Sequence, residues 1–242
     1  EGVETQPHPW LENCLLLSRS GNVEELEAFQ RGLFYIQDPA SRLAVLASGA
    51  AAGMRVLDVC AAPGGKSFAA AIQMENQGEV VSCDLHPHKK TLIHRGAERL
   101  GLSCIQAFTA DGKVRRTEWE DAFDLVLVDA PCSGLGVIRK KPDIRYKDPE
   151  PLASLPSVQN AILDNACGYV KPGGVLLYST CTILRQENQE VTDRFLVEHP
   201  EFVREGISLP GPAGEVPEGQ LTLWPQIHGT DGFYLCKLRK EG

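Results

Sequence analysis

Short apolar strand patterns alternate with helix patterns from Gly53 onward, and this alternation restricts the possible folds more than any other feature of the chain. Strands are predicted at 55–59, 79–84, 103–108, 124–129 and 175–180, and helices at 66–77, 87–100, 156–170 and 186–199. This order builds βαβ units, so we expect an α/β fold with helices on both faces of a mostly parallel sheet. Two further strands, 221–224 and 232–238, are predicted to be antiparallel.

The region before Gly53 is less regular. A short strand is predicted at 32–37, followed directly by a helix at 39–48. Asp38 is a suitable N-cap for this helix, and Pro39 is favoured at the first helical position. Gly49 is expected to end the helix.

The composition is that of a globular domain and disfavours several functional classes. The chain has 242 residues, of which 43% are hydrophobic and 23% are charged. No apolar run is long enough to cross a bilayer and no signal peptide is visible, so we expect a cytoplasmic protein without a membrane partner. The eight cysteines include no CxxC pair and no zinc-ligand spacing, which predicts reduced thiols and no bound metal.

A glycine-rich turn after the first strand predicts a ligand that approaches the backbone closely at a helix N-terminus. The turn is formed by Cys60, Ala61, Ala62, Pro63, Gly64, Gly65 and Lys66. It matches neither the GxGxxG nor the Walker pattern. Acids follow the next three strands, namely Asp84, Asp111 and Asp129, and an acid at the position of Asp84 is typical of ribose binding. Together they indicate S-adenosylmethionine; alternatively, each acid is a solvated strand end or cap.

Two cysteines follow adjacent strands of the predicted sheet, Cys132 after the fourth and Cys181 after the fifth. A thiolate near a methyl donor suits methylation of a pyrimidine at carbon 5, because thiolate attack at carbon 6 makes carbon 5 nucleophilic. A carboxyl group such as Asp129 would donate a proton or hydrogen bond to the ring nitrogen, and the base must be unstacked. The residues alone do not order the two cysteines, and either could instead be a buried small hydrophobe.

Three segments, Asp58–Lys66, Asp129–Ser133 and Ser179–Cys181, resemble the motifs of the RNA cytosine-C5 methyltransferases of the Sun/Fmu family. Segment 136–145 is most similar to the bacterial branch that acts on small-subunit ribosomal RNA, and 230–234 also fits. The resemblance covers about residues 32–240 and implies a class I S-adenosylmethionine-dependent, Rossmann-like fold with an antiparallel last strand. It further implies that residues 60–66, Asp84, Asp111 and Asp129 hold the cofactor, that Cys181 is the nucleophile and that Cys132 assists product release.

The resemblance also implies a domain organisation and a partner. Residues 1–31 are expected to be the remnant of a small α+β subdomain and 32–242 the catalytic domain, without the family's N-terminal RNA-binding domain. The expected partner is RNA, most readily small-subunit ribosomal RNA, bound by a monomer. Alternatives are a methyltransferase acting on tRNA and a non-catalytic cofactor-binding RNA-assembly factor. An amino-group methyltransferase is disfavoured, because Asp-Ala-Pro-Cys at 129–132 replaces the Asn/Asp-Pro-Pro-Tyr/Phe turn of that class.

The formal net charge of −8 argues against a broad basic face for RNA. The sign reverses locally between 139 and 184, because five cations lie within nine residues that contain only one acid, Asp143. This segment is predicted to grip RNA phosphates beside Cys132, although a solvated loop is the alternative. Its cations are Arg139, Lys140, Lys141, Arg145 and Lys147.

Overall fold

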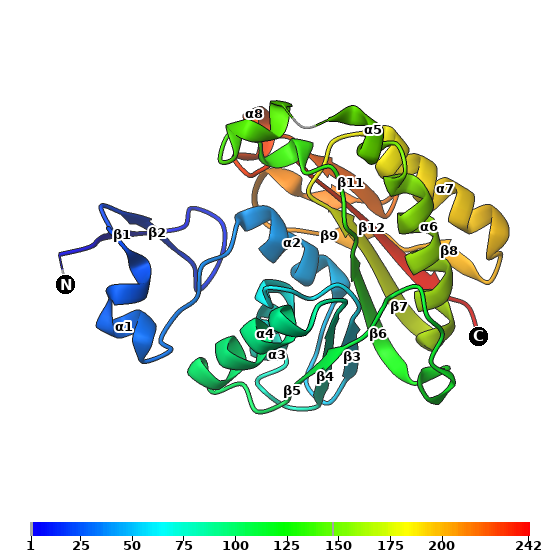
Figure 1. The fold of residues 1–242 in the computed structure, drawn as a ribbon, viewed down its shortest axis with the longest axis horizontal. Helices are drawn as coiled ribbons and strands as arrows, with labels where there is room; N and C mark the ends of the chain where they lie inside the picture. Colours follow the sequence, from blue (N-terminus) through cyan, green and yellow to red (C-terminus); the bar gives the residue numbers. More distant parts are fainter. Residues whose placement is uncertain (1, 147) are drawn as a thin grey trace.

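The structure, a computed structural model, describes residues 2–146 and 148–242 and is built around one eight-stranded sheet (Figure 1). The strands follow the order β11-β12-β7-β6-β3-β4-β5, and β8 pairs with β12 beside this path. Strands β3 to β7 pair in parallel, whereas β12 runs antiparallel to its neighbours. The strands are β3 (Arg55–Asp58), β4 (Glu79–Asp84), β5 (Ile105–Thr109), β6 (Phe123–Asp129), β7 (Val170–Thr180), β8 (Phe202–Arg204), β11 (Gln220–Leu223) and β12 (Phe233–Lys240).

Helices cover both faces of this sheet (Figure 1). Successive side chains of a strand point to opposite faces, so Leu125 of β6 packs in one core and Val126 in the other. The core of Leu125 includes residues of three helices, α2 (Pro39–Ser48), α3 (Gly65–Gln73) and α4 (Pro87–Arg99). The core of Val126 includes residues of α6 (Leu155–Ala166) and α7 (Gln189–Glu198). The predicted α/β architecture with an antiparallel C-terminal pair is therefore confirmed.

Short elements complete the described chain. The N-terminal part forms a hairpin and one helical turn, which lie at the left of Figure 1, away from the large sheet. The hairpin and the turn are β1 (Glu4–Pro7), β2 (Leu15–Ser18) and α1 (Glu27–Gln30). The remaining short elements lie between or after the main helices and are α5 (Pro149–Leu152), β9 (Ile207–Ser208), β10 (Glu215–Val216) and α8 (Pro225–His228).

The helix predicted at 39–48 is confirmed together with both of its ends. The Asp38 carboxylate accepts a hydrogen bond from the Ala40 N–H at 2.9 Å, and Gly49 ends the helix in the left-handed region. The strand predicted just before it, at 32–37, is wrong. The Phe34 carbonyl accepts from the Arg99 guanidinium at 3.0 Å rather than from another strand, so this segment runs irregularly past α4.

Two predicted helices end earlier in the structure than expected. Helix α3 ends at Gln73 rather than 77, because Glu75 and Asn76 both take positive φ angles that no α-helix continues through. Helix α6 ends at Ala166 rather than 170, and β7 begins at Val170, where it already pairs with Phe123 of β6. The Lys-Pro-Gly-Gly segment at 171–174 is therefore part of the strand and not a helix end.

Within the part of the chain that the structure describes, no helix combines the length and apolar character that crossing a bilayer requires.

Candidate active site

The carboxyl ends of β3, β4, β6 and β7 bring polar side chains together at one edge of the sheet. Neighbouring parallel strands in register place Asp58 beside Ser82 and Asp129 beside Ser179. Ligands of open parallel sheets bind at this edge. The turns that carry Cys132 and Cys181 follow β6 and β7, which pair in parallel, so both turns lie at this edge as predicted.

The glycine-rich turn packs closely against β4 before α3 begins. The Ala61 N–H donates to the Cys83 carbonyl at 2.7 Å, and the Ala62 N–H donates to the Asp84 carboxylate at 3.3 Å. Gly64 is required at the start of α3, because its φ is +114° and a Cβ there would lie 2.3 Å from the Phe68 ring. The free helix N-terminus that results is suited to an anionic group of a ligand.

The predicted ribose acid, Asp84, is almost fully buried at the end of β4. Its carboxylate accepts from the backbone N–H of Ala62 and from that of His86, which fixes its orientation. Each carboxylate oxygen has a second lone pair for a ligand hydroxyl. Asp111 follows β5 and is half-buried, with its carboxylate capping the turn through the Lys113 N–H at 2.9 Å.

Asp58 opens the first motif, yet the sequence analysis did not single it out as a site residue. It is fully buried and its carboxylate accepts from the Ser67 hydroxyl at 2.7 Å. Burial raises its pKa to about 7. This contact joins the end of β3 to the first turn of α3, so Asp58 stabilises the conformation of the cofactor turn between them. Burial also raises the pKa of Cys60 in that turn, which favours the protonated thiol.

The two cysteines lie together, with 3.2 Å between the Cys132 and Cys181 sulfur atoms. A hydrogen bond from the Cys132 thiol lowers the pKa of Cys181, and the positive charge of Lys66 acts in the same direction. The same thiol contact, together with burial, raises the pKa of Cys132. Of the two thiols, Cys181 is therefore the one that loses its proton more readily.

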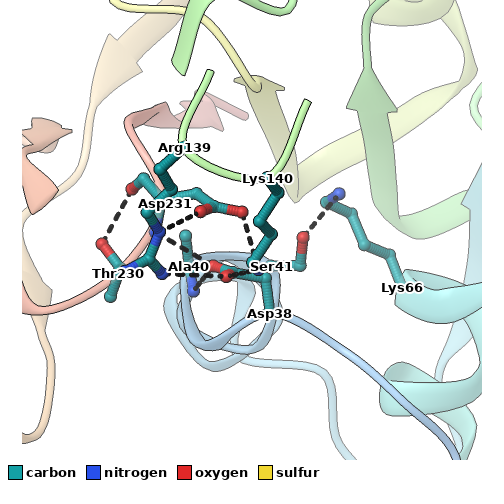
Figure 2. A network of polar contacts seen from close by, with 8 residues as sticks. All are labelled: Asp38, Ala40, Ser41, Lys66, Arg139, Lys140, Thr230 and Asp231. Carbon is teal, nitrogen blue, oxygen red and sulfur yellow. Dashed lines mark hydrogen bonds and ion pairs between the residues drawn. The ribbon is translucent and has the colours of Figure 1, made fainter. Parts of the chain in front are cut away.

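Asp129 lies beside the cysteine pair and is held by two neighbours. The Ser179 hydroxyl donates to one carboxylate oxygen at 2.8 Å, and the Lys66 ammonium donates to the other at 2.6 Å. Lys66 is predicted in the cofactor turn, and its buried side chain extends to Asp129. Its ammonium also lies 3.5 Å from the Ser41 hydroxyl of α2, the contact that Figure 2 shows. Ser179 was not predicted as a site residue, although it lies near the end of β7 in the motif that contains Cys181.

The predicted RNA-gripping segment supplies two cations to an internal ion-pair cluster, formed by Asp38, Arg139, Lys140 and Asp231 (Figure 2). Arg139 lies 2.7 Å and Lys140 lies 2.9 Å from the Asp231 carboxylate, and both also pair with Asp38. The two acids are largely buried and the two cations about half exposed.

The other cations of that segment lie differently. Lys141 and Arg145 are exposed to solvent, and Arg145 lies against the Tyr146 ring at 5.6 Å. The prediction for Lys147 lies outside the described residues. Among the described residues, no group of three or more His, Cys, Asp or Glu side chains is arranged to hold a metal ion.

The sheet order, the glycine-rich turn after its first parallel strand and the acids at the strand ends define the class I S-adenosylmethionine-dependent methyltransferase fold. Residues 46–239 match the sequence profile of the family described as 16S rRNA methyltransferase RsmB/F. The chain therefore belongs to that family.

Individual relatives agree with this assignment. The chain is 45% identical to the "Probable ribosomal RNA small subunit methyltransferase B" of Bacillus subtilis, in a match that covers 100% of this chain and 55% of that protein. The crystal structure of PH0851 superposes with a TM-score of 0.92 at 31% identity, covering 99% of this chain and 54% of the other. The crystal structure of NSun6 from Pyrococcus horikoshii with SFG superposes with a TM-score of 0.76 at 29% identity, covering 90% and 56%.

The chain thus spans about half the length of the curated relatives it matches. Family membership confirms S-adenosylmethionine as the predicted cofactor. The residues present fit that group, because an uncapped helix N-terminus at Gly64 and oriented carboxylates at Asp84 and Asp111 suit its carboxylate and its adenosine hydroxyl and amino groups.

Proposed function

We propose that this chain is the catalytic part of an enzyme that transfers a methyl group from S-adenosylmethionine to carbon 5 of a cytosine in RNA. Small-subunit ribosomal RNA is the substrate that its family and its relatives' names favour. The observation that carries the proposal is the pair of cysteines, 3.2 Å apart, beside Asp129 at the cofactor edge of the sheet.

The geometry suits each residue to one step. The Cys181 thiolate attacks carbon 6 of the cytosine, forming a sulfur–carbon bond and moving electron density toward carbon 5 and the ring nitrogen. Asp129 accepts from the Lys66 ammonium at 2.6 Å, and a proton passed from that ammonium would let the Asp129 carboxyl group give the proton or hydrogen bond that the ring nitrogen then needs. The turn at 60–66, Asp84 and Asp111 would hold S-adenosylmethionine, which would supply the methyl group to carbon 5, with S-adenosylhomocysteine as the leaving group. A base then takes the carbon-5 proton, the carbon 5–carbon 6 double bond re-forms, and the ring nitrogen returns its proton. The sulfur–carbon bond breaks with its electron pair leaving on the Cys181 sulfur, to which the Cys132 thiol gives a proton as the product is released.

The lowered pKa of Cys181 and the raised pKa of Cys132 support this order of roles. A thiolate is the better nucleophile, whereas a thiol can give a proton to a departing sulfur. The ion pair of Lys66 with Asp129, beside the two cysteines, supports a role for the Lys66 side chain near the target base, in addition to its place in the turn at 60–66.

Two matched substitutions test the proposal on denaturing gels with radiolabelled RNA. Cys181→Ala is expected to abolish both methyl transfer and the covalent adduct. Cys132→Ala is expected to trap an adduct, because attack survives and release fails. The reverse pattern would exchange the roles. Cofactor binding by the wild-type chain without transfer to any cytosine-containing RNA would favour the non-catalytic assembly factor, and transfer confined to tRNA would correct the substrate.

A further inference from the structure

Two buried side chains form hydrogen bonds to the backbone on either side of Cys132. Gln159 of α6 donates from its amide nitrogen to the Pro131 carbonyl at 2.9 Å. On the other side of the cysteine, the Ser133 N–H donates to the Glu187 carboxylate at 2.8 Å. Both Gln159 and Glu187 are at most 1% exposed.

The side chains of Gln159 and Glu187 also form a hydrogen bond with each other. The Gln159 amide donates to the same Glu187 oxygen that the Ser133 N–H reaches, at 2.9 Å. The Tyr178 hydroxyl donates to the Glu187 backbone carbonyl at 2.7 Å, which fixes Glu187 against β7. The backbone on each side of Cys132 is thus tied to one small polar network, formed by side chains of α6, β7 and the segment before α7.

A further hydrogen bond joins the segments of the two cysteines. Ser133 follows Cys132 and Thr182 follows Cys181, and their fully buried hydroxyls lie 2.8 Å apart. The Cys181 segment has its own support, because the Thr180 hydroxyl donates to the Asn188 side-chain oxygen at 2.6 Å and the Asn188 amide donates to the Thr182 carbonyl at 3.0 Å. Each thiol is therefore placed by a separate network, and one hydroxyl pair connects the two.

Stability alone does not account for Glu187. Among the described residues, one of its carboxylate oxygens and the side-chain oxygen of Gln159 are buried without a hydrogen-bond partner. A buried acceptor left unpaired costs about 1–3 kcal/mol, more when charged, so these two oxygens offset part of the stability that the hydrogen bonds of the network contribute.

From these contacts we propose that Gln159 and Glu187 are positioning residues that hold Cys132 at the distance and angle at which it acts on the Cys181 adduct. The role in release rests on the proposed function, whereas the placement of the thiol does not. Loss of the Glu187 carboxylate frees the Ser133 N–H and the Gln159 amide together, so the Cys132 segment moves while the Asn188 support of Cys181 stays in place.

Glu187→Ala tests the proposal, and Glu187→Gln is its conservative partner because the amide oxygen still accepts from the Ser133 N–H. Since a displacement of about 1 Å can cost on the order of 100-fold in rate, we expect kcat to fall at least tenfold in Glu187→Ala while KM changes little. The adduct should accumulate as in Cys132→Ala. Glu187→Gln should recover most of kcat. Asn188→Ala, which loosens the other thiol, should instead reduce adduct formation.

Asp124→Ala is the matched control, because the Asp124 carboxylate also accepts a backbone N–H, that of Arg55 at 2.8 Å, but at the opposite end of β6. It is expected to lower thermal stability without changing the ratio of adduct to product. A Glu187→Ala protein with the adduct-to-product ratio of Asp124→Ala would overturn the proposal.

A second measurement needs neither RNA nor cofactor. Diamide, an azo oxidant, accepts two electrons and two protons as it converts two nearby thiols to a disulfide, so the rate of the Cys132–Cys181 cross-link reports their proximity. Peptide mass spectrometry should show a cross-link rate at least tenfold slower in Glu187→Ala and near wild type in Asp124→Ala. Gln159→Ala, which removes the hydrogen bonds to the Pro131 carbonyl and to Glu187, repeats the test if Glu187→Ala does not fold. An unchanged cross-linking rate in the variant that folds would refute the positioning role, whereas absence of any adduct in Cys132→Ala would refute the proposed function alone.

Discussion

Gly136 lies where three backbone segments meet beside Cys132 and Cys181, and an alanine there should force these segments apart. Its N–H donates to the Cys181 carbonyl at 3.0 Å, and its carbonyl accepts from the Gly232 N–H at 2.9 Å. A Cβ at this position would lie 1.8 Å from the Gly232 carbonyl oxygen and 2.8 Å from that of Cys181. Both are backbone atoms, so no side-chain rotation relieves the overlap.

The cost of Gly136→Ala follows from these distances. Separating the segments breaks two backbone hydrogen bonds, each worth about 1 kcal/mol net. Overpacking adds about 1–3 kcal/mol. The sum of about 3–5 kcal/mol should lower the melting temperature by roughly 6–20 °C, at about 2–4 °C per kcal/mol for a domain of this size. Because the Cys181 carbonyl is one of the displaced atoms, the rate of adduct formation should also fall by on the order of 100-fold.

Gly206→Ala is the control, since its Cβ would lie 3.5 Å from the nearest atom, the Pro217 carbonyl oxygen, in ordinary contact. Urea titration and thermal melting measure the stability of both variants, and rapid-quench gels measure adduct formation with excess RNA. The reasoning would be refuted if the free energy of unfolding of Gly136→Ala were within about 0.5 kcal/mol of that of Gly206→Ala and the adduct formed at the wild-type rate. The contacts of Gly136 with Cys181 and Gly232 would then not hold the Cys181 turn in place.

Three further predictions concern charge and protonation. The rate of adduct formation by Cys132→Ala, measured against pH, should rise at a higher pH than in wild type, because the hydrogen bond that lowers the pKa of Cys181 is lost; an unmoved profile would contradict this. The double variant Lys141→Ala/Arg145→Ala should bind RNA with a salt slope lower by about 1–2, measured by filter binding from low to high salt, and an unchanged slope would remove both from the contact surface. Asp231→Asn should cost about 1 kcal/mol at pH 7, because its two cationic partners are half exposed. The pKa of Asp231 is lowered in the folded protein by its hydrogen bonds to Lys140 and Arg139. The stability that its carboxylate contributes is therefore present above the unfolded pKa of about 3.9 and is lost as the pH falls through the lower folded value. The denaturation curves of Asp231→Asn and wild type should converge in acid.

The elements that the sequence predicted well are those whose ends are set by neighbouring residues. Asp38 and Gly49 bound α2 through contacts within one helical turn, so the pattern of capping residues was enough to place both ends. The strand predicted at 32–37 had suitable residues but no partner. Whether an extended segment joins a sheet depends on what lies beside it after folding, and Arg99, which takes the Phe34 carbonyl, lies 65 positions away.

The candidate site divides in the same way. Parallel pairing of β6 and β7 brings Cys132 and Cys181 to one rim, which the alternation of strands and helices was sufficient to predict. The partners of individual side chains could not be predicted from that alternation. Lys66 sits in a motif at a helix start, and only the folded chain brings its ammonium to Asp129, 63 positions further on. The role of Glu187 could not be predicted from the sequence, because Glu187 lies in a polar run that resembles the solvent-exposed start of a helix.

The basic segment illustrates the limit of charge counting. A run of cations along the chain indicates a positive loop only if the acids that face it are counted too, and those acids are distant in sequence. Asp231 lies 92 positions from Arg139, and Asp38 lies 102 positions from Lys140. In the folded cluster two cations meet two carboxylates, so their charges largely cancel for an approaching phosphate. The attraction that RNA would feel from the described part of this loop therefore rests on Lys141 and Arg145, while Arg139 and Lys140 tie the loop to α2 and to the turn before β12.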